Sequence, residues 1–179
     1  DNSAVPLPVI LTGPQSSAEY FKQIDEFIGA TIGDEARSRY RIVIDDPAEV
    51  GRAIRQGAQA AQAYRQARRD AFFFNWQLTI EPEFQRPFMA THEAMAGLLL
   101  ERDMEPHALA ANLRRAFSGL VAGNIRDDGV RAIKKHGPFE IRGDKTIMRC
   151  LDNLLGAFVE QGRMRLPGKP YEPCYRVIT

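Results

Sequence analysis

Two short runs of consecutive apolar residues organise the first third of the chain. Residues 9–11 read Val-Ile-Leu and residues 42–44 read Ile-Val-Ile, without the polar–apolar alternation of a half-exposed strand. Such continuous runs are typical of strands buried on both faces of a parallel sheet. Residues 17–32 lie between them, carry apolar positions at helical spacing and are long enough for the crossover helix of a parallel pair. The pattern predicts a strand–helix–strand–helix unit of an α/β fold.

This unit contains too few strands to be stable by itself. A parallel sheet of two strands needs further strands or helices to cover it. We therefore expect the chain to be the C-terminal piece of a larger α/β protein, or its first sheet to be completed by another polypeptide. The missing strands would come from the N-terminal part of the same protein or from another polypeptide.

Helix start signals follow both runs. Ser16 to Glu19 matches a capping box, and a helix start beside a strand end is also a natural site for an anion, so a plain capped helix and a phosphate contact both explain it. Asp46, Pro47 and Glu49 predict an N-cap, so we assign the pair Asp45 and Asp46 to structure rather than to a metal or ribose contact. The helix after Asp46 becomes polar and rich in Ala and Gln towards Arg69, which predicts a linker and a domain boundary there.

Residues 70–179 show strands at the start, middle and end with helices between them, which predicts a smaller α+β domain. Strands are expected over 70–80, 139–142 and 171–178. Helices are expected to begin at Thr91, with Leu98 and Leu99 on the buried face, at Pro106 and after Asp144. His92 has no second metal ligand at helical spacing, so we interpret it as exposed and structural.

Composition limits the possible partners. The 179 residues carry a net charge of +1, which gives no overall field for nucleic acid, although scattered arginines and Trp76 leave a local site as an alternative. No apolar run approaches the roughly 20 residues that span a bilayer, and the first residues lack the pattern of a signal peptide. Cys150 and Cys174 are expected to be free thiols. We expect a cytoplasmic protein with no nucleic-acid or membrane partner.

The chain lacks a complete set of catalytic residues by pattern. It has no phosphate-binding glycine loop, no Ser-His-Asp signature and no metal-spaced Cys/His cluster, so we expect no cofactor and no metal. Residues Thr12, Gly13 and Pro14 follow the first strand, where ligands bind in open parallel sheets. Arg65, Arg68 and Arg69 fall within about one helical turn, which suits either a phosphate or the C-terminal end of a helix dipole.

Several longer motifs resemble a known family. They are Leu7 to Pro14, Tyr40 to Asp46, Phe74-Asn75-Trp76, Leu113 to Asn124, Gly143-Asp144-Lys145 and Pro173-Cys174-Tyr175. They resemble the bacterial pyrimidine/purine nucleotide 5′-monophosphate nucleosidases, which are phosphoribohydrolases with a lysine-decarboxylase-like Rossmann domain. The resemblance covers essentially the whole chain, as the C-terminal part of such a protein. It implies that residues 1–69 are the C-terminal portion of a Rossmann-like nucleotide-binding domain, with a linker helix.

The resemblance implies a hydrolase that splits nucleoside monophosphates into a base and ribose 5-phosphate. It also implies a homo-oligomer, a tetramer, controlled by guanosine tetra- and pentaphosphate alarmones. The family's Pro-Gly-Gly-x-Gly-Thr signature is absent here, so this segment alone is expected to be inactive. Thr12, Gly13 and Pro14 are carried over as a wall of the nucleotide pocket.

The alarmone ligands are chosen by chemistry, because a highly anionic molecule needs convergent arginines. The candidates are Arg65, Arg68, Arg69, Arg114 and Arg115. The alternative to an enzyme segment is a non-catalytic module for regulation and oligomerisation that binds an anionic nucleotide or a partner subunit.

Overall fold

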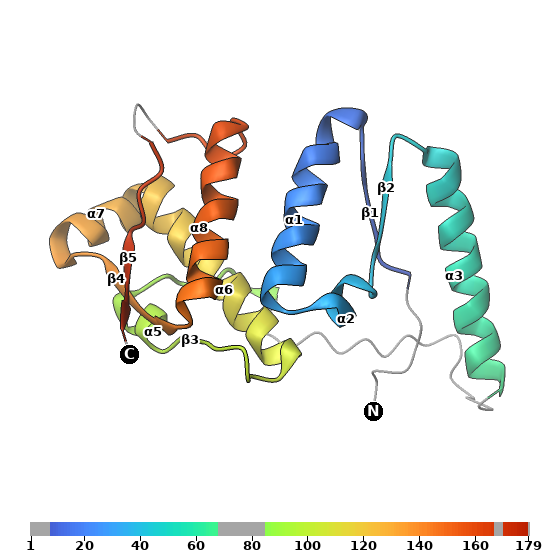
Figure 1. Ribbon diagram of the computed structural model, residues 1–179, viewed down its shortest axis with the longest axis horizontal. Coiled ribbons are helices and arrows are strands. Elements are labelled where there is room, and N and C mark those ends of the chain that lie inside the picture. Colours follow the sequence, from blue (N-terminus) through green and yellow to red (C-terminus); the bar gives the residue numbers. More distant parts are fainter. Residues whose placement is uncertain (1–7, 68–84, 167–169, 179) are drawn as a thin grey trace.

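Two separate parallel sheets form the framework of the molecule (Figure 1). The computed structural model describes residues 8–67, 85–166 and 170–178. Strands β1 (Ile10–Gly13) and β2 (Arg41–Ile44) pair in parallel, with Ile10 opposite Arg41. The second sheet has the order β3-β4-β5, with β3 at Leu99–Leu100, β4 at Phe139–Gly143 and β5 at Tyr175–Ile178. The predicted α/β class is confirmed.

Helices flank the first sheet. Helix α1 (Ala18–Thr31) and the short helix α2 (Asp34–Arg37) connect its strands, and α3 (Pro47–Ala67) follows β2. In Figure 1 the two strands lie between α1 and α3. Val9 and Ile54 are each 51% exposed, and Val43 is the strand residue that is buried. Within the described residues, this sheet therefore leaves apolar surface uncovered.

The second sheet is built from two strand–helix–strand crossovers. Helices α6 (Pro106–Ile125) and α7 (Asp127–His136) connect β3 to β4, and α8 (Lys145–Glu160) connects β4 to β5. Both strand pairs are parallel, a direction that the sequence pattern had left open. The fully buried side chains of the second sheet and its helices form the main core, which includes Leu100, Leu120, Phe139, Ile141, Ile147, Leu151 and Leu155.

The two sheets are joined by the packing of α1 on α8, which run side by side in Figure 1. Tyr20, Ile24 and Phe27 of α1 pack against the main core. The rings of Tyr20 and Phe158 have centroids 5.1 Å apart. The first sheet is thus attached to the hydrophobic core of the second through one face of one helix.

Local signals predicted most of the helix boundaries. Asp46 caps α3 by accepting a hydrogen bond from the Glu49 amide at 2.8 Å, and α6 begins at Pro106 as expected. Asp144 caps α8 by accepting from the amides of Thr146 and Ile147. At Asp46 and Asp144 a short polar side chain satisfies amides that have no partner within the helix.

Three predictions were wrong. The capping box expected over Ser16 to Glu19 is not formed: α1 follows Ser17, which makes no capping hydrogen bond, and the Ser17 amide closes a tight turn by donating to the Pro14 carbonyl at 2.8 Å. The helix after Thr91, α5 (His92–Ala96), ends before Leu99, which instead pairs with Arg142 in the sheet. His92 is half-buried rather than exposed, and its ring lies 4.8 Å from that of Phe139.

Other predictions fall on residues that the structure does not describe. The strand expected over 70–80, with Trp76, and the boundary near Arg69 lie outside the described residues. The helix expected to lead to that boundary is α3, which is described to Ala67.

Two helical glycines give a matched test of this packing. A Cβ at Gly129 of α7 would lie 2.3 Å from the Ala122 carbonyl oxygen of α6, whereas a Cβ at Gly156 of α8 meets nothing within 4 Å. We expect Gly129→Ala to lower the free energy of unfolding by about 1–3 kcal/mol. Gly156→Ala should raise it by up to about 1 kcal/mol through helix propensity. Urea unfolding followed by circular dichroism measures both, and an unchanged midpoint for Gly129→Ala would contradict the close approach of α6 and α7.

Candidate functional site

The first candidate site is the edge of the β1–β2 sheet where both strands end. Gly13 pairs with Ile44, and the Asp45 amide donates to the Gly13 carbonyl at 2.9 Å, so the segments that follow the two strands lie side by side. Thr12 and Pro14 are exposed there. This is the carboxyl end of a parallel sheet, the usual position of a ligand in an open α/β fold.

Gly13 allows the following turn to lie close against the strand. A Cβ at this position would be 3.1 Å from the Ser17 Cβ and 3.2 Å from Cε2 of Phe21. A larger residue would therefore push the turn and the start of α1 away from β1. Because residue 13 is a glycine, the turn after Pro14 and the start of α1 pack directly against the end of β1.

Asp45 adopts a left-handed backbone conformation, which among non-glycine residues Asp and Asn adopt most readily. Its φ is 55°, and it is the non-glycine residue with a positive φ among the described parts of the chain. Positive φ at a non-glycine residue is found at turns and also at functional sites. Asp46 caps α3, so capping accounts for Asp46 but not for the exposed carboxylate of Asp45. The sequence does not reveal a positive φ, so the sequence analysis assigned both Asp45 and Asp46 to a structural role.

The segment after α8 reaches back to this edge. The guanidinium carbon of Arg163 lies 4.3 Å from the centroid of the Tyr20 ring, and its Nη2 donates to the Ser16 carbonyl at 3.5 Å. Gln161 donates to the Gln23 side chain at 2.8 Å. A cation over an aromatic face is attractive, so this segment braces the turn that follows Pro14. Sequence analysis did not predict this contact, because Ser16 and Arg163 lie far apart in the chain.

The second candidate site is a cavity of about 330 Å³, which we call the arginine cavity. It is lined by Arg86, Arg114 and Arg115, and the rest of its wall is Pro87, Phe88 and Met89. Three guanidinium groups facing one space suit phosphate oxygens, which they can bind in bidentate fashion. Sequence analysis found Arg114 and Arg115 but missed Arg86, which lies 28 positions earlier and is brought near by the fold.

Hydrogen bonds hold one of these arginines in place. Nη1 of Arg115 donates to Oδ1 of Asn112 at 3.0 Å, and Nδ2 of Asn112 donates to the Leu99 carbonyl at 3.0 Å. Arg115 is half-buried, and Arg114 is exposed. The chain from β3 through Asn112 fixes part of the cavity wall before any ligand arrives, which reduces the ordering cost of binding.

The remaining candidate arginines are not in this cavity. Arg65 lies on α3, which Figure 1 shows on the far side of the first sheet from α6, and its side chain is 8% exposed. Arg68 and Arg69 lie outside the described residues. The structure brings Arg114 and Arg115 together with Arg86 and does not bring Arg65 to them.

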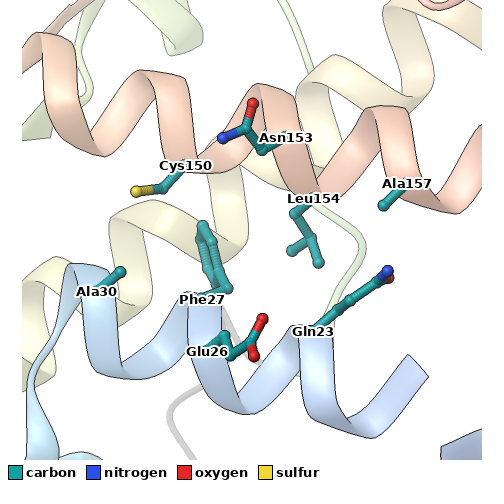
Figure 2. Close-up of a pocket in the computed structure, with 8 residues that line it drawn as sticks. All are labelled: Gln23, Glu26, Phe27, Ala30, Cys150, Asn153, Leu154 and Ala157. Carbon is teal, nitrogen blue, oxygen red and sulfur yellow. The ribbon is translucent and has the colours of Figure 1, made fainter. Parts of the chain in front are cut away.

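A further cavity, of about 300 Å³, lies between α1 and α8. Figure 2 shows Phe27 reaching from α1 towards α8 and Leu154 reaching from α8 towards α1, with Cys150 at one end. Cys150 is half-buried, and both cysteines are free. The interface that joins the two sheets is therefore incompletely packed.

The environment of Cys174 is different. It is 8% exposed, its Sγ lies 3.3 Å from Nδ2 of Asn124, and burial raises the pKa of its thiol to about 11. Nearby, the hydroxyls of Tyr171 and Tyr175 donate to the two carboxylate oxygens of Asp152 at 2.8 and 2.7 Å, and burial raises the pKa of both tyrosines. These groups attach β5 to α8 and have a structural role.

Metal chemistry and membrane insertion find no support in the parts of the chain that are described. Those residues contain no group of three or more His, Cys, Asp or Glu side chains placed to hold a metal ion. Among the same residues, every helix is too short or too polar to cross a bilayer.

The family described as "Pyrimidine/purine nucleotide monophosphate nucleosidase, C-terminal" matches residues 58–178. The chain belongs to this family. The match begins within α3 and includes every element of the second sheet, so the arginine cavity lies inside the family domain and the Thr12 edge lies before it.

Relatives of this nucleosidase family extend the similarity to almost the whole chain. The pyrimidine/purine nucleotide 5′-monophosphate nucleosidases of Escherichia coli strains K12, O6:H1 and O157:H7 are each 51% identical over 173 residues. These residues make up 97% of the chain and 38% of each relative. The chain therefore spans well under half the length of the curated relatives it matches.

The two cysteines allow a direct test of the local structure. The thiolate is the reactive form, so Cys174, which is buried and has a raised pKa, should stay unmodified by iodoacetamide at pH 8 in the native chain. Cys150, at the α1–α8 cavity, should be modified. Peptide mass spectrometry before and after unfolding in urea distinguishes the two. Native labelling of Cys174 at the rate of Cys150 would contradict the packing of β5.

Proposed function

We propose that this chain is the C-terminal part of an enzyme that hydrolyses the N-glycosidic bond of nucleoside monophosphates, releasing a base and ribose 5-phosphate. The observation that carries the proposal is the 51% identity, over 97% of the chain, to nucleosidases of that name. The family membership of residues 58–178 supports the same conclusion.

In this proposal, the Thr12 edge forms one wall of the nucleotide pocket. Thr12, Gly13 and Pro14 lie at the carboxyl end of β1, beside Asp45 at the end of β2. An ionised carboxylate only accepts hydrogen bonds, and ribose hydroxyls can donate them, so Asp45 is placed to bind the sugar. The glycine-rich catalytic signature is absent from this sequence, so the chain by itself is inactive and catalysis requires the N-terminal part of the same protein.

The two parts of the chain, each with its own sheet, have different proposed roles. Residues 1–69 complete the nucleotide-binding domain, and residues 70–179 form a regulatory and assembly domain within a cytoplasmic homo-oligomer, a tetramer. The arginine cavity binds guanosine tetra- or pentaphosphate, because three guanidinium groups lining one space match a ligand with several phosphates. The alternative is that residues 70–179 are a non-catalytic module for regulation and oligomerisation, which binds an anionic nucleotide or a partner subunit and does no chemistry itself.

A chimaera tests the enzymatic proposal. The chain replaces the matching segment of the Escherichia coli nucleosidase, and base release from AMP and GMP is followed by chromatography. The chimaera should release base, whereas the same protein without the segment should not. A folded chimaera that releases no base would remove the enzymatic proposal.

Two adjacent aspartates give a matched pair within the chimaera. Asp45→Asn should raise KM for AMP about tenfold, because the substitution removes a charged acceptor while Asn tolerates the positive φ. Asp46→Asn should leave KM and kcat unchanged, because Asn caps a helix as well as Asp. Equal effects of the two substitutions would exclude a special role for Asp45.

Calorimetry tests the regulatory proposal on the 179-residue chain. Guanosine tetraphosphate should bind, and Arg114→Ala and Arg115→Ala should each weaken binding about tenfold through loss of a charge-assisted contact. Arg149→Ala, an exposed arginine on α8, is the control for lost positive charge and should have little effect. Affinity that is the same in all three variants would place the alarmone elsewhere.

A further inference from the structure

The cavity between α1 and α8 has the size and the wall of a small-molecule site (Figure 2). Its volume of about 300 Å³ is at the lower end of the range of roughly 300–1,000 Å³ that is usual for such sites. Phe27 and Leu154 supply its apolar surface, and the side chains of Gln23, Glu26 and Asn153 supply polar groups. Both helices contribute to the wall, so the cavity lies within the interface that joins the two sheets.

Helix geometry and two small side chains create this space. The lining positions are 23, 26, 27 and 30 on α1 and 150, 153, 154 and 157 on α8. This spacing places them on one face of each helix. At the last position of each set the helix carries an alanine, Ala30 or Ala157, where a longer side chain would fill the gap between the helices. Atoms beside such a gap lose packing contacts, which a bound molecule restores.

The charge of this cavity is opposite to that of the arginine cavity. Among the described residues that line it, Glu26 is charged and no lysine, arginine or histidine is present. Lys22, on the same helix, lies 3.9 Å from a carboxylate oxygen of Glu26 and 3.9 Å from one of Glu19, and these side chains are 60–63% exposed. Ion pairs this exposed contribute little to stability, and one lysine does not neutralise two carboxylates. The cavity therefore favours a cation at Glu26 and disfavours an anion.

The other wall groups favour a cation with an apolar body. Figure 2 shows Phe27 reaching from α1 towards α8, beside Glu26. The face of an aromatic ring attracts an ammonium group within about 6 Å, and side-chain amide oxygens accept its N–H bonds. Leu154 is buried and reaches towards α1 from the opposite wall. An apolar group placed against Phe27 and Leu154 is removed from water, which adds to its affinity.

We propose that the α1–α8 cavity binds a small organic amine in its protonated form, with the ammonium group at the Glu26 carboxylate and the apolar body against Phe27 and Leu154. The site shares no wall residue with the arginine cavity and does not depend on the proposed hydrolysis of nucleotides. A molecule held there contacts both helices at once. Because it binds the packed interface, it stabilises the attachment of the first sheet to the second.

Three probes with one apolar body and different charges test the proposal. The amine 3-phenylpropylamine, the alcohol 3-phenylpropanol and the carboxylate 3-phenylpropionate are each titrated by calorimetry into the 179-residue chain at pH 7. The amine should bind about tenfold more tightly than the alcohol, because its ammonium group makes a charge-assisted contact with Glu26. The carboxylate should bind most weakly. Absence of amine binding, or equal affinity for the three probes, would overturn the proposal.

Two variants with the same change of charge locate the contact. Glu26→Gln should abolish the preference for the amine over the alcohol. Glu160→Gln, at an exposed position on α8 that does not line the cavity, should keep the preference. Circular dichroism confirms that both variants are folded. A preference that survives Glu26→Gln, or that both variants lose equally, overturns the assignment of the ammonium group to Glu26.

The thiol of Cys150 reports occupancy without any variant, because it lines the cavity and is free. At about four times its Kd, the amine should slow the modification of Cys150 by iodoacetamide about fivefold, since only the unoccupied fraction reacts. Peptide mass spectrometry over time measures the rate. An unchanged rate in the presence of bound amine would place the amine elsewhere and overturn the proposed site.

Discussion

The contact between α1 and α8 connects the two halves of this structure. Tyr20, Ile24 and Phe27 bury one face of α1 on the core of the second sheet, and the tilted rings of Tyr20 and Phe158 are in contact there. Polar contacts close both ends of the interface: Gln161 to Gln23 at one end, and Arg102 to the Ala30 carbonyl at the other. Burial of apolar surface is non-directional, whereas hydrogen bonds are directional, so these two contacts favour one placement of α1 on the second sheet and its helices.

This interface relates the two candidate sites to each other. Phe158 of α8 also meets Phe117 of α6, with ring centroids 6.0 Å apart, and α6 carries Arg114 and Arg115. On the other side, Tyr20 lies under Arg163, which contacts the turn after Pro14. Aromatic side chains in contact therefore connect the helix of the arginine cavity to the edge of the first sheet. The cavity between α1 and α8 leaves room for one helix to shift on the other, because a gap removes the packing contacts that resist movement.

Local signals in the sequence predicted the features that depend on neighbouring residues. The caps at Asp46, Thr91 and Asp144 and the helix start at Pro106 all follow from residues within one turn. The two-residue strand β3 could not be predicted, since Leu99 is a strand only because Arg142, far along the chain, pairs with it. Arg86 was missed as a site residue for the same reason, because a loop acquires a partner in α6 only when the chain has folded.

The close approach of α6 and α7 has a consequence for ligand selection. At Gly129 the spacing of the two helices is set by main chain against main chain, with no rotatable side chain between them. The cavity of about 140 Å³ beside it, which is lined by Ala122, Asp128 and Gly129 among others, therefore has a wall of closely packed main chain on this side. Main chain packed in this way moves less readily than a side chain, so a molecule that is too large for the cavity is excluded. A molecule that fits does not have to order side chains on this wall, which would reduce its affinity.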